Sequence, residues 1–296
     1  MPARTVPLQK RWRRFRMGLS TLLGRPKGYF IPYRHADIPV SRAPYAGIAA
    51  IFQHAEPQFR QRLAALDRHA DAMLAIGATE IDSPPPEPRW HQGWFTGLDA
   101  AMAYTLVRDT APTRIIEVGS GHSTRFLARA VRDGRLNTRI VAIDPQPRAD
   151  LLTLPVTAHR TPVQLVGESV FAGLTAGDML FIDSSHIAMP GTDVDWLVGR
   201  VLPRLPAGVR VHIHDIFLPD PYPEAWAWRG YNEHQVVAAL LAGGGFKPIW
   251  SSVYARRYLA QDFTGSVVDR LPLIGGALET SLWVEKTVPA AASAPV

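Results

Sequence analysis

Short apolar runs of about five residues alternate with segments of helical periodicity from Trp90 onward, and this alternation is the strongest constraint on the fold. Such a pattern predicts βαβ units, whose strands form a buried parallel sheet with helices on both faces. We therefore expect an α/β fold with a doubly wound, mostly parallel sheet. The expected strands cover 114–118, 139–144, 163–166, 179–183, 209–214, 246–254 and 281–285, and the expected helices cover 123–132, 194–205 and 232–242.

The composition is that of a globular protein, with 47% hydrophobic and 20% charged residues in a chain of 296. These values exclude a disordered, collagen-like or coiled-coil chain. The chain has no cysteine, so disulfide scaffolds, cysteine zinc sites and thiol catalysis are excluded. Any bound metal would need histidine, carboxylate or backbone oxygen ligands.

The N-terminal arm, residues 1–27, carries most of the excess positive charge. Residues 1–34 hold nine Lys/Arg and no acid, whereas the remainder holds 23 basic and 26 acidic residues. No nucleic-acid partner is expected, because the body is not basic. Trp12, Phe15, Leu19 and Leu22 recur at helical spacing among arginines, as in helices on anionic membrane surfaces. Two alternatives stay open: residues 10–27 contact a membrane peripherally, or the apolar stripe docks on the body or a second subunit.

Three further segments follow the arm. Residues 28–89 form an N-terminal extension that ends in a proline-rich linker, 90–287 form the main domain, and 288–296 form an Ala/Pro-rich tail expected to be disordered. No secretory signal or membrane-spanning run is evident, so the expected location is the cytoplasm, with its membrane face open as the arm's target.

A glycine-containing loop follows the first expected strand and precedes a helix. Gly119 and Gly121 allow a ligand to approach the backbone there, and the helix start offers free N–H groups. Asp144 ends the second expected strand, 25 residues after Gly119, where a carboxylate can accept ribose hydroxyls. The alternative for Asp144 is a helix cap before Pro145.

Polar residues also end the fourth and fifth expected strands. Asp183, His214 and Asp215 would meet at the carboxyl edge of the sheet, and this donor set suits a divalent cation. The alternative is a buried ion pair in which imidazole and carboxylate satisfy each other.

The motif Glu117-Val118-Gly119-Ser120-Gly121 resembles that of the class I S-adenosylmethionine-dependent methyltransferases. The resemblance covers about residues 90–285 and implies the family's Rossmann-like, seven-stranded sheet. It also implies S-adenosylmethionine as cofactor, with Asp144 matching the acid after the second strand. The cofactor-binding residues implied are Glu117, Gly119, Ser120, Gly121, Ser123, Asp144, Glu168 and Asp183.

Metal-dependent O-methyltransferases of this fold are similar at the strand ends that carry Asp183 and Asp215. That resemblance implies Mg²⁺ or Mn²⁺ held by Asp183, His214 and Asp215, although His214 stands where the family usually has a carboxylate. It further implies a general base at His186, three residues after Asp183. The expected reaction is metal-assisted O-methylation of a sugar, another hydroxylated small molecule or a glycan.

Two other functions stay open at this point. One is an NAD-dependent oxidoreductase on a related sheet, which the missing third glycine at Thr124 disfavours. The other is a non-catalytic, membrane-associated protein that retains the fold. A homo-oligomer is compatible with every reading.

Overall fold

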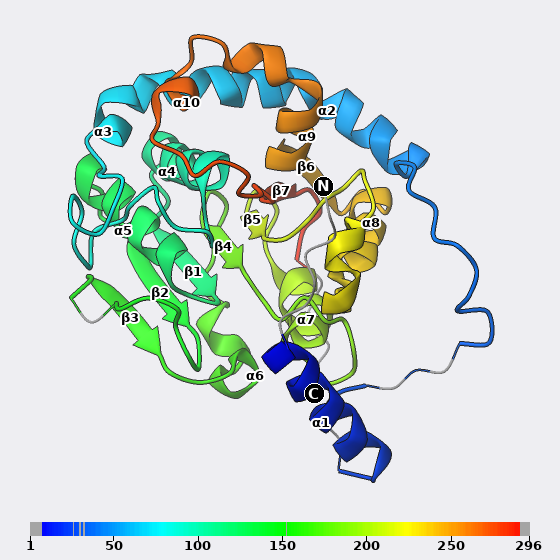
Figure 1. Ribbon diagram of the computed structural model, residues 1–296. Coiled ribbons are helices and arrows are strands. Elements are labelled where there is room, and N and C mark those ends of the chain that lie inside the picture. The colour runs from blue at the N-terminus through cyan, green and yellow to red at the C-terminus, as the bar shows by residue number, and fades with distance from the viewer. Residues whose placement is uncertain (1–7, 26, 30, 32, 152, 291–296) are drawn as a thin grey trace.

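The computed structural model describes residues 8–25, 27–29, 31, 33–151 and 153–290. Parts of the arm and of the C-terminal tail lie outside the described residues, and so does the predicted disorder of residues 291–296. Within these ranges, the fold is the expected α/β sandwich around one twisted sheet (Figure 1).

The sheet has seven strands in the order β3-β2-β1-β4-β5-β7-β6. Strands β1 to β5 run parallel, and β7 runs antiparallel between β5 and β6. The central strands are almost wholly buried, as expected for a sheet covered on both faces. The strands are β1 (Arg114–Val118), β2 (Arg139–Ile143), β3 (Val156–His159), β4 (Met179–Ile182), β5 (Arg210–Ile213), β6 (Phe246–Ser251) and β7 (Leu282–Lys286).

Helices surround this sheet, and several of the shorter ones lie next to the strand ends. The longer helices are α1 (Leu8–Leu22), α2 (Ala46–Ala65), α4 (Gly97–Thr110), α5 (His122–Gly134), α8 (Glu233–Ala242) and α9 (Ser252–Tyr258). The short helical segments are η1 (Leu66–His69), α3 (Ala70–Leu74), α6 (Val163–Val166), η2 (Glu168–Val170), α7 (Asp193–Trp196), the π-helix η3 (Leu197–Val201), η4 (Leu202–Arg204), η5 (Glu224–Arg229), η6 (Ala260–Phe263) and α10 (Val267–Arg270). No described helix is both long and apolar enough to cross a bilayer.

The N-terminal extension packs into the same core as the sheet. Phe52 and Phe59 of α2 are fully buried, and the Phe59 ring lies 6.3 Å from that of Trp250 on β6. In the proline-rich segment, Glu87 forms ion pairs with Arg129 and Arg132 of α5. The extension is therefore held against β6 through α2 and against helix α5 through Glu87.

The third expected strand is wrong, because residues 163–166 form helix α6 instead. Pro162 precedes this helix and Gly167, at φ +87°, ends it. A segment of four residues, three of them apolar, is too short for periodicity to separate a strand from a helical turn. The real β3 is a half-exposed edge strand, which lacks the apolar signal of the central strands. The expected strand over 246–254 also ends early, since Ser251 caps helix α9 by accepting a hydrogen bond from the Tyr254 N–H.

Candidate active site

The site lies where the strand order reverses, between β1 and β4. In doubly wound sheets the chain leaves two such neighbours in opposite directions, which opens a crevice at their carboxyl ends. Gly119 follows β1 and Asp183 follows β4. The Asp183 N–H donates to the Val118 carbonyl at 2.8 Å, so the two loops leave the sheet in contact.

Gly119 is required by this contact between loops. Its φ is +81°, and a Cβ at this position would lie 1.9 Å from the Asp183 carbonyl oxygen. The absence of a side chain at Gly119 therefore lets the Asp183 backbone approach this loop closely, in addition to any ligand.

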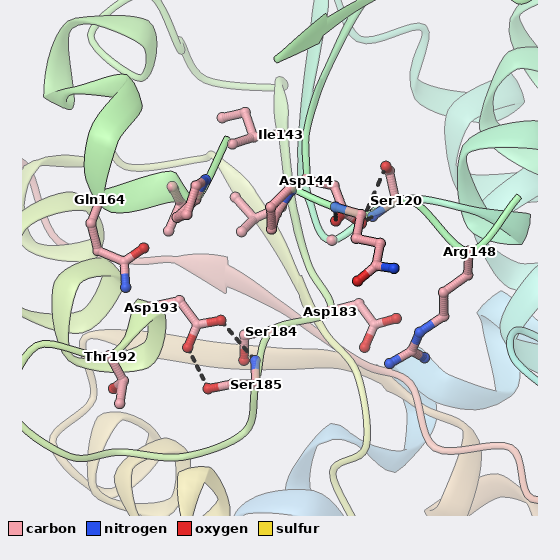
Figure 2. Close-up of a pocket in the computed structure, with 16 residues that line it drawn as sticks. Ser120, Ile143, Asp144, Arg148, Gln164, Asp183, Ser184, Ser185, Thr192 and Asp193 are labelled. Carbon is pink, nitrogen blue, oxygen red and sulfur yellow. Dashed lines mark hydrogen bonds between the residues drawn. The ribbon is translucent and has the colours of Figure 1, made fainter. Parts of the chain in front are cut away.

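A cavity of about 460 Å³ opens beside these loops (Figure 2). This volume is within the usual range for small-ligand sites. Loops after β1, β2 and β4 form most of the wall, and the starts of α6 and α7 complete it. The lining residues that Figure 2 labels are Ser120, Ile143, Asp144, Arg148, Gln164, Asp183, Ser184, Ser185, Thr192 and Asp193.

Asp144 faces the cavity as expected from its place at the end of β2. One carboxylate oxygen accepts the Ser120 N–H at 2.6 Å, and the other accepts the Gln146 N–H at 2.7 Å. Asp144 thus fixes the glycine loop relative to β2 while remaining at the cavity wall.

Several residues expected to bind cofactor do not line this cavity. Glu117 is fully buried beneath the loop, where it accepts hydrogen bonds from Ser123 and Thr124, and the Gly121 N–H donates to the Thr124 hydroxyl. These groups build the start of α5. Glu168 lies elsewhere, paired with Arg200 and Arg204. The prediction that Glu168 binds the cofactor rests on a third strand over 163–166. These residues form helix α6, so Glu168 does not follow a strand.

Burial raises the pKa of Glu117 to about 8, and hydrogen bonds from Ser123 and Thr124 offset only part of this effect. The folded protein therefore keeps this proton up to about pH 8, whereas the unfolded chain releases it near 4.5. Because the folded state binds more protons over this interval, the free energy of unfolding falls as the pH rises through it.

We expect the variant Glu117→Gln to lose this pH dependence, since the amide is neutral and can still bond both hydroxyls. Relative to the wild type it should gain stability between pH 5 and pH 8.5, on the order of 4 kcal/mol at about 1.4 kcal/mol per pKa unit. Urea denaturation at the two pH values measures the difference. Parallel pH curves for the two proteins would contradict the assignment.

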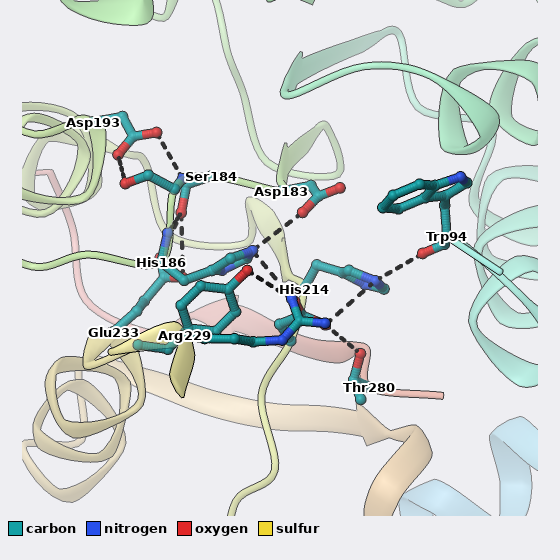
Figure 3. A network of polar contacts seen from close by, with 12 residues as sticks. Trp94, Asp183, Ser184, His186, Asp193, His214, Arg229, Glu233 and Thr280 are labelled. Carbon is teal, nitrogen blue, oxygen red and sulfur yellow. Dashed lines mark hydrogen bonds and ion pairs between the residues drawn. The ribbon is translucent and has the colours of Figure 1, made fainter. Parts of the chain in front are cut away.

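A second set of polar residues surrounds His186, directly behind the cavity wall (Figure 3). The His186 side chain is buried, and its backbone has φ +61°, an uncommon conformation for a residue other than glycine. Its Nδ1 lies 2.9 Å from Glu233 Oε2. Its Nε2 lies 3.3 Å from Asp183 Oδ1 and 3.5 Å from Asp215 Oδ2. One imidazole therefore contacts three carboxylates.

Charge interactions outweigh burial in this cluster. Burial alone would lower the pKa of His186, but hydrogen bonds with Asp183 and Glu233 raise it well above the ordinary value of 6.5. Burial alone would raise the pKa of Asp183, but the hydrogen bond with His186 and the charges of His214 and Arg148 lower it below its usual range. At neutral pH the pair is therefore an imidazolium and a carboxylate.

The expected metal ligands are brought near one another but do not form the expected site. His214 Nε2 donates to the Trp94 carbonyl at 3.2 Å and lies 3.8 Å from Asp215. The ring of His186 lies between Asp183 and Asp215, where it supplies a positive charge. Over the described part of the chain, no group of three or more His, Asp or Glu side chains is arranged to hold a metal ion. The residues present thus do not fit the cation predicted from the sequence.

The sequence reasoning missed Glu233 and Asn232 at the start of α8. The backbone N–H groups of Asn232 and Glu233 donate to the His186 carbonyl, and the Asn232 side chain accepts the Ala188 N–H at 2.7 Å. Ser184 donates to the Glu233 carboxylate at 3.3 Å. These residues hold the loop after β4 against α8, and no local motif marks them.

The aromatic segment after β5 packs largely on itself. The Trp226 ring lies 4.9 Å from Phe217, and the Arg229 guanidinium lies 4.0 Å from the Trp226 ring centroid. Tyr231 lies 4.6 Å from His186, ring to ring, so this segment covers the His186 cluster. We call residues 220–232 the cap.

Residues 116–216, which run from β1 to the end of β5, match a family model described as a methyltransferase domain. This region is a class I, S-adenosylmethionine-dependent methyltransferase domain. The match favours the methyltransferase reading over the NAD-dependent oxidoreductase.

Solved structures that are similar to this chain are distant from it in sequence. They include the O-methyltransferase TomG of Streptomyces achromogenes, involved in tomaymycin synthesis, in complex with S-adenosylmethionine (16% identity, 96% of this chain and 100% of that chain, TM-score 0.41). Others are a putative O-methyltransferase of Klebsiella pneumoniae (14%, 95% and 100%, 0.36) and the branched-chain polyamine synthase of Thermus thermophilus (17%, 88% and 74%, 0.40). No curated protein matches the chain. At these identities and scores the structures indicate nothing about the acceptor.

Proposed function

We propose that this methyltransferase transfers a methyl group to a hydroxyl oxygen of a small molecule or glycan. The observation that carries the proposal is the position of Asp183, whose carboxylate lines the cavity on one side and contacts the buried His186 on the other. Asp183 therefore places a negative charge in the cavity wall, where it can orient an acceptor hydroxyl, and His186 holds this carboxylate from behind.

The residues present fit S-adenosylmethionine in the cavity. Asp144 is placed to accept ribose hydroxyls, the backbone of the loop at Gly119 and Ser120 forms the adjoining wall, and Arg148 extends toward Asp183 (Figure 2). When bound, the cofactor supplies an electrophilic methyl group on a sulfonium centre.

Asp183 is the residue we assign to the acceptor hydroxyl. Its carboxylate would accept the hydrogen bond of the hydroxyl, orient the oxygen and receive the proton that the oxygen, made strongly acidic by methylation, releases. The assignment of His186 as general base is replaced, because its ring is buried, does not line the cavity and is already protonated. His186 is a positioning residue, since its charge holds Asp183 in place. We derive no step through a metal, because the donor set does not fit one.

Sugars and glycans are the acceptor class we favour. The cap places Tyr231 beside His186 in the charged cluster, and an aromatic ring near carboxylates is suited to hydroxylated ring substrates.

Cofactor binding separates this proposal from a non-catalytic role for the fold. We expect the protein to bind S-adenosylhomocysteine with micromolar affinity, and Asp144→Ala to weaken binding about tenfold or more because a charge-assisted hydrogen bond is lost. Isothermal titration calorimetry measures both. The control is Glu168→Gln, which alters a carboxylate placed outside the cavity and should leave the affinity unchanged. Failure of the unaltered protein to bind would reject the proposal.

A further inference from the structure

Helix α1 exposes an apolar stripe that the rest of the described chain does not cover. At 3.6 residues per turn, five of its large apolar side chains fall within roughly a third of the helix circumference, and Met17 lies on the opposite face. None of its residues is buried, and Trp12 and Phe15 remain 61% and 58% exposed. The stripe consists of Leu8, Trp12, Phe15, Leu19 and Leu22.

The helix contacts the body through a different face. The Lys10 ammonium lies 5.2 Å from the ring centroid of Trp228 in the cap, a cation–π contact. Helical geometry places Lys10 about half a turn around the axis from the stripe. After the helix, the Tyr29 hydroxyl donates to the Pro190 carbonyl at 2.9 Å. These contacts hold α1 beside the cap with the apolar stripe directed away from the body.

The rest of the α1 surface carries several basic residues. Arg11, Arg13, Arg14 and Arg16 lie between the apolar positions, and residues 1–34 contain no acid. Among the described residues, none of these four arginines forms an ion pair with an acidic side chain. Helix α1 therefore exposes apolar side chains and arginines without acidic partners on one short segment.

We propose that α1 binds the surface of an anionic phospholipid bilayer and lies in its plane. The apolar stripe would enter the acyl boundary while Arg11 and Arg16, which flank it on the helix, contact lipid phosphates. A span is excluded, because 15 residues reach only about 22 Å, short of a bilayer core of about 30 Å. Pairing of two copies through this face is disfavoured, because each helix would bring like charges and no acid. The proposal does not depend on methyl transfer.

Flotation of the full-length protein with vesicles tests the proposal. Vesicles of phosphatidylcholine with 30% phosphatidylglycerol should carry the protein in low salt, whereas pure phosphatidylcholine vesicles or high salt should carry much less. Removing one positive charge beside the stripe, as in Arg16→Gln, should lower the partition coefficient about fivefold. The matched control is Arg270→Gln, an exposed arginine on α10, which should behave as the wild type.

The apolar part is tested by the double variant Trp12→Ala with Phe15→Ala, which should lose at least tenfold in partitioning. Its control is Ile81→Ala, which removes a side chain that is 93% exposed elsewhere on the surface. Because none of these side chains is buried in the core, the fold should persist, and circular dichroism checks this. Equal flotation of the double variant and its control would overturn the proposal. So would a wild-type dimer that the double variant abolishes in sedimentation, without any vesicle binding.

Discussion

Replacing Asp183 by asparagine is expected to lower the kcat of methyl transfer by roughly 10²–10⁴-fold, the usual contribution of a positioned proton acceptor. Asparagine keeps the shape of the side chain and removes its charge, so the acceptor hydroxyl loses its proton acceptor. The assay follows a tritiated methyl group from S-adenosylmethionine to a panel of glycosides. Calorimetry with S-adenosylhomocysteine shows whether the cofactor site is retained in the variant.

The dependence of kcat on pH distinguishes Asp183 from His186 as the proton acceptor. The pKa of Asp183 is lowered and that of His186 is raised well above 6.5, so both groups keep their charge near neutrality. We expect a flat profile between about pH 6 and pH 8. A rate that rises with pH through the ordinary imidazole range would instead identify His186 as the base. Loss of activity with a chelator, restored by Mg²⁺ or Mn²⁺, would contradict the absence of a metal step.

Gly119→Ala is expected to lower the free energy of unfolding by roughly 4 kcal/mol or more, because the new Cβ meets a backbone carbonyl that cannot move aside. That oxygen belongs to Asp183 and lies 1.9 Å from the Cβ position. The variant must separate the loops after β1 and β4, so S-adenosylhomocysteine binding should also be lost. Urea denaturation and calorimetry measure the two effects.

Gly265→Ala is the matched control for this substitution. Gly265 has nearly the same φ, +79°, but nothing lies within 4 Å of its Cβ position. It should therefore show only the cost of the positive φ, about 1–3 kcal/mol. Similar losses in the two variants would mean that the contact between the loops contributes nothing.

The sequence was sufficient for the parts of the site that follow buried strands. Gly119, Asp144 and Asp183 each come directly after an apolar run, and parallel strands bring their carboxyl ends to one edge. Glu233 was missed because its contact with His186 joins residues 47 apart, and no periodicity records such a distance.

The role of His186 could not be predicted for a similar reason. A histidine three residues after Asp183 is compatible with a base in the cavity or with a buried charge, and sequence spacing does not distinguish the two. The difference depends on three carboxylates, from the loops after β4 and β5 and from α8, that converge only in the folded chain. Edge strand β3 could not be predicted either, because a half-exposed strand lacks a continuous apolar run.

The two backbone hydrogen bonds of Asp144 have a consequence for how tightly a ligand binds. An ionised carboxylate has about four lone-pair positions, and the N–H groups of Ser120 and Gln146 occupy two of them. The Ser120 hydroxyl makes a longer third hydrogen bond to Oδ2, at 3.4 Å, and the remaining position matches a ribose hydroxyl. The conformational entropy of this side chain is therefore lost when the chain folds, before any ligand arrives. Binding does not bear that entropic cost, so the carboxylate is preorganised for its ligand.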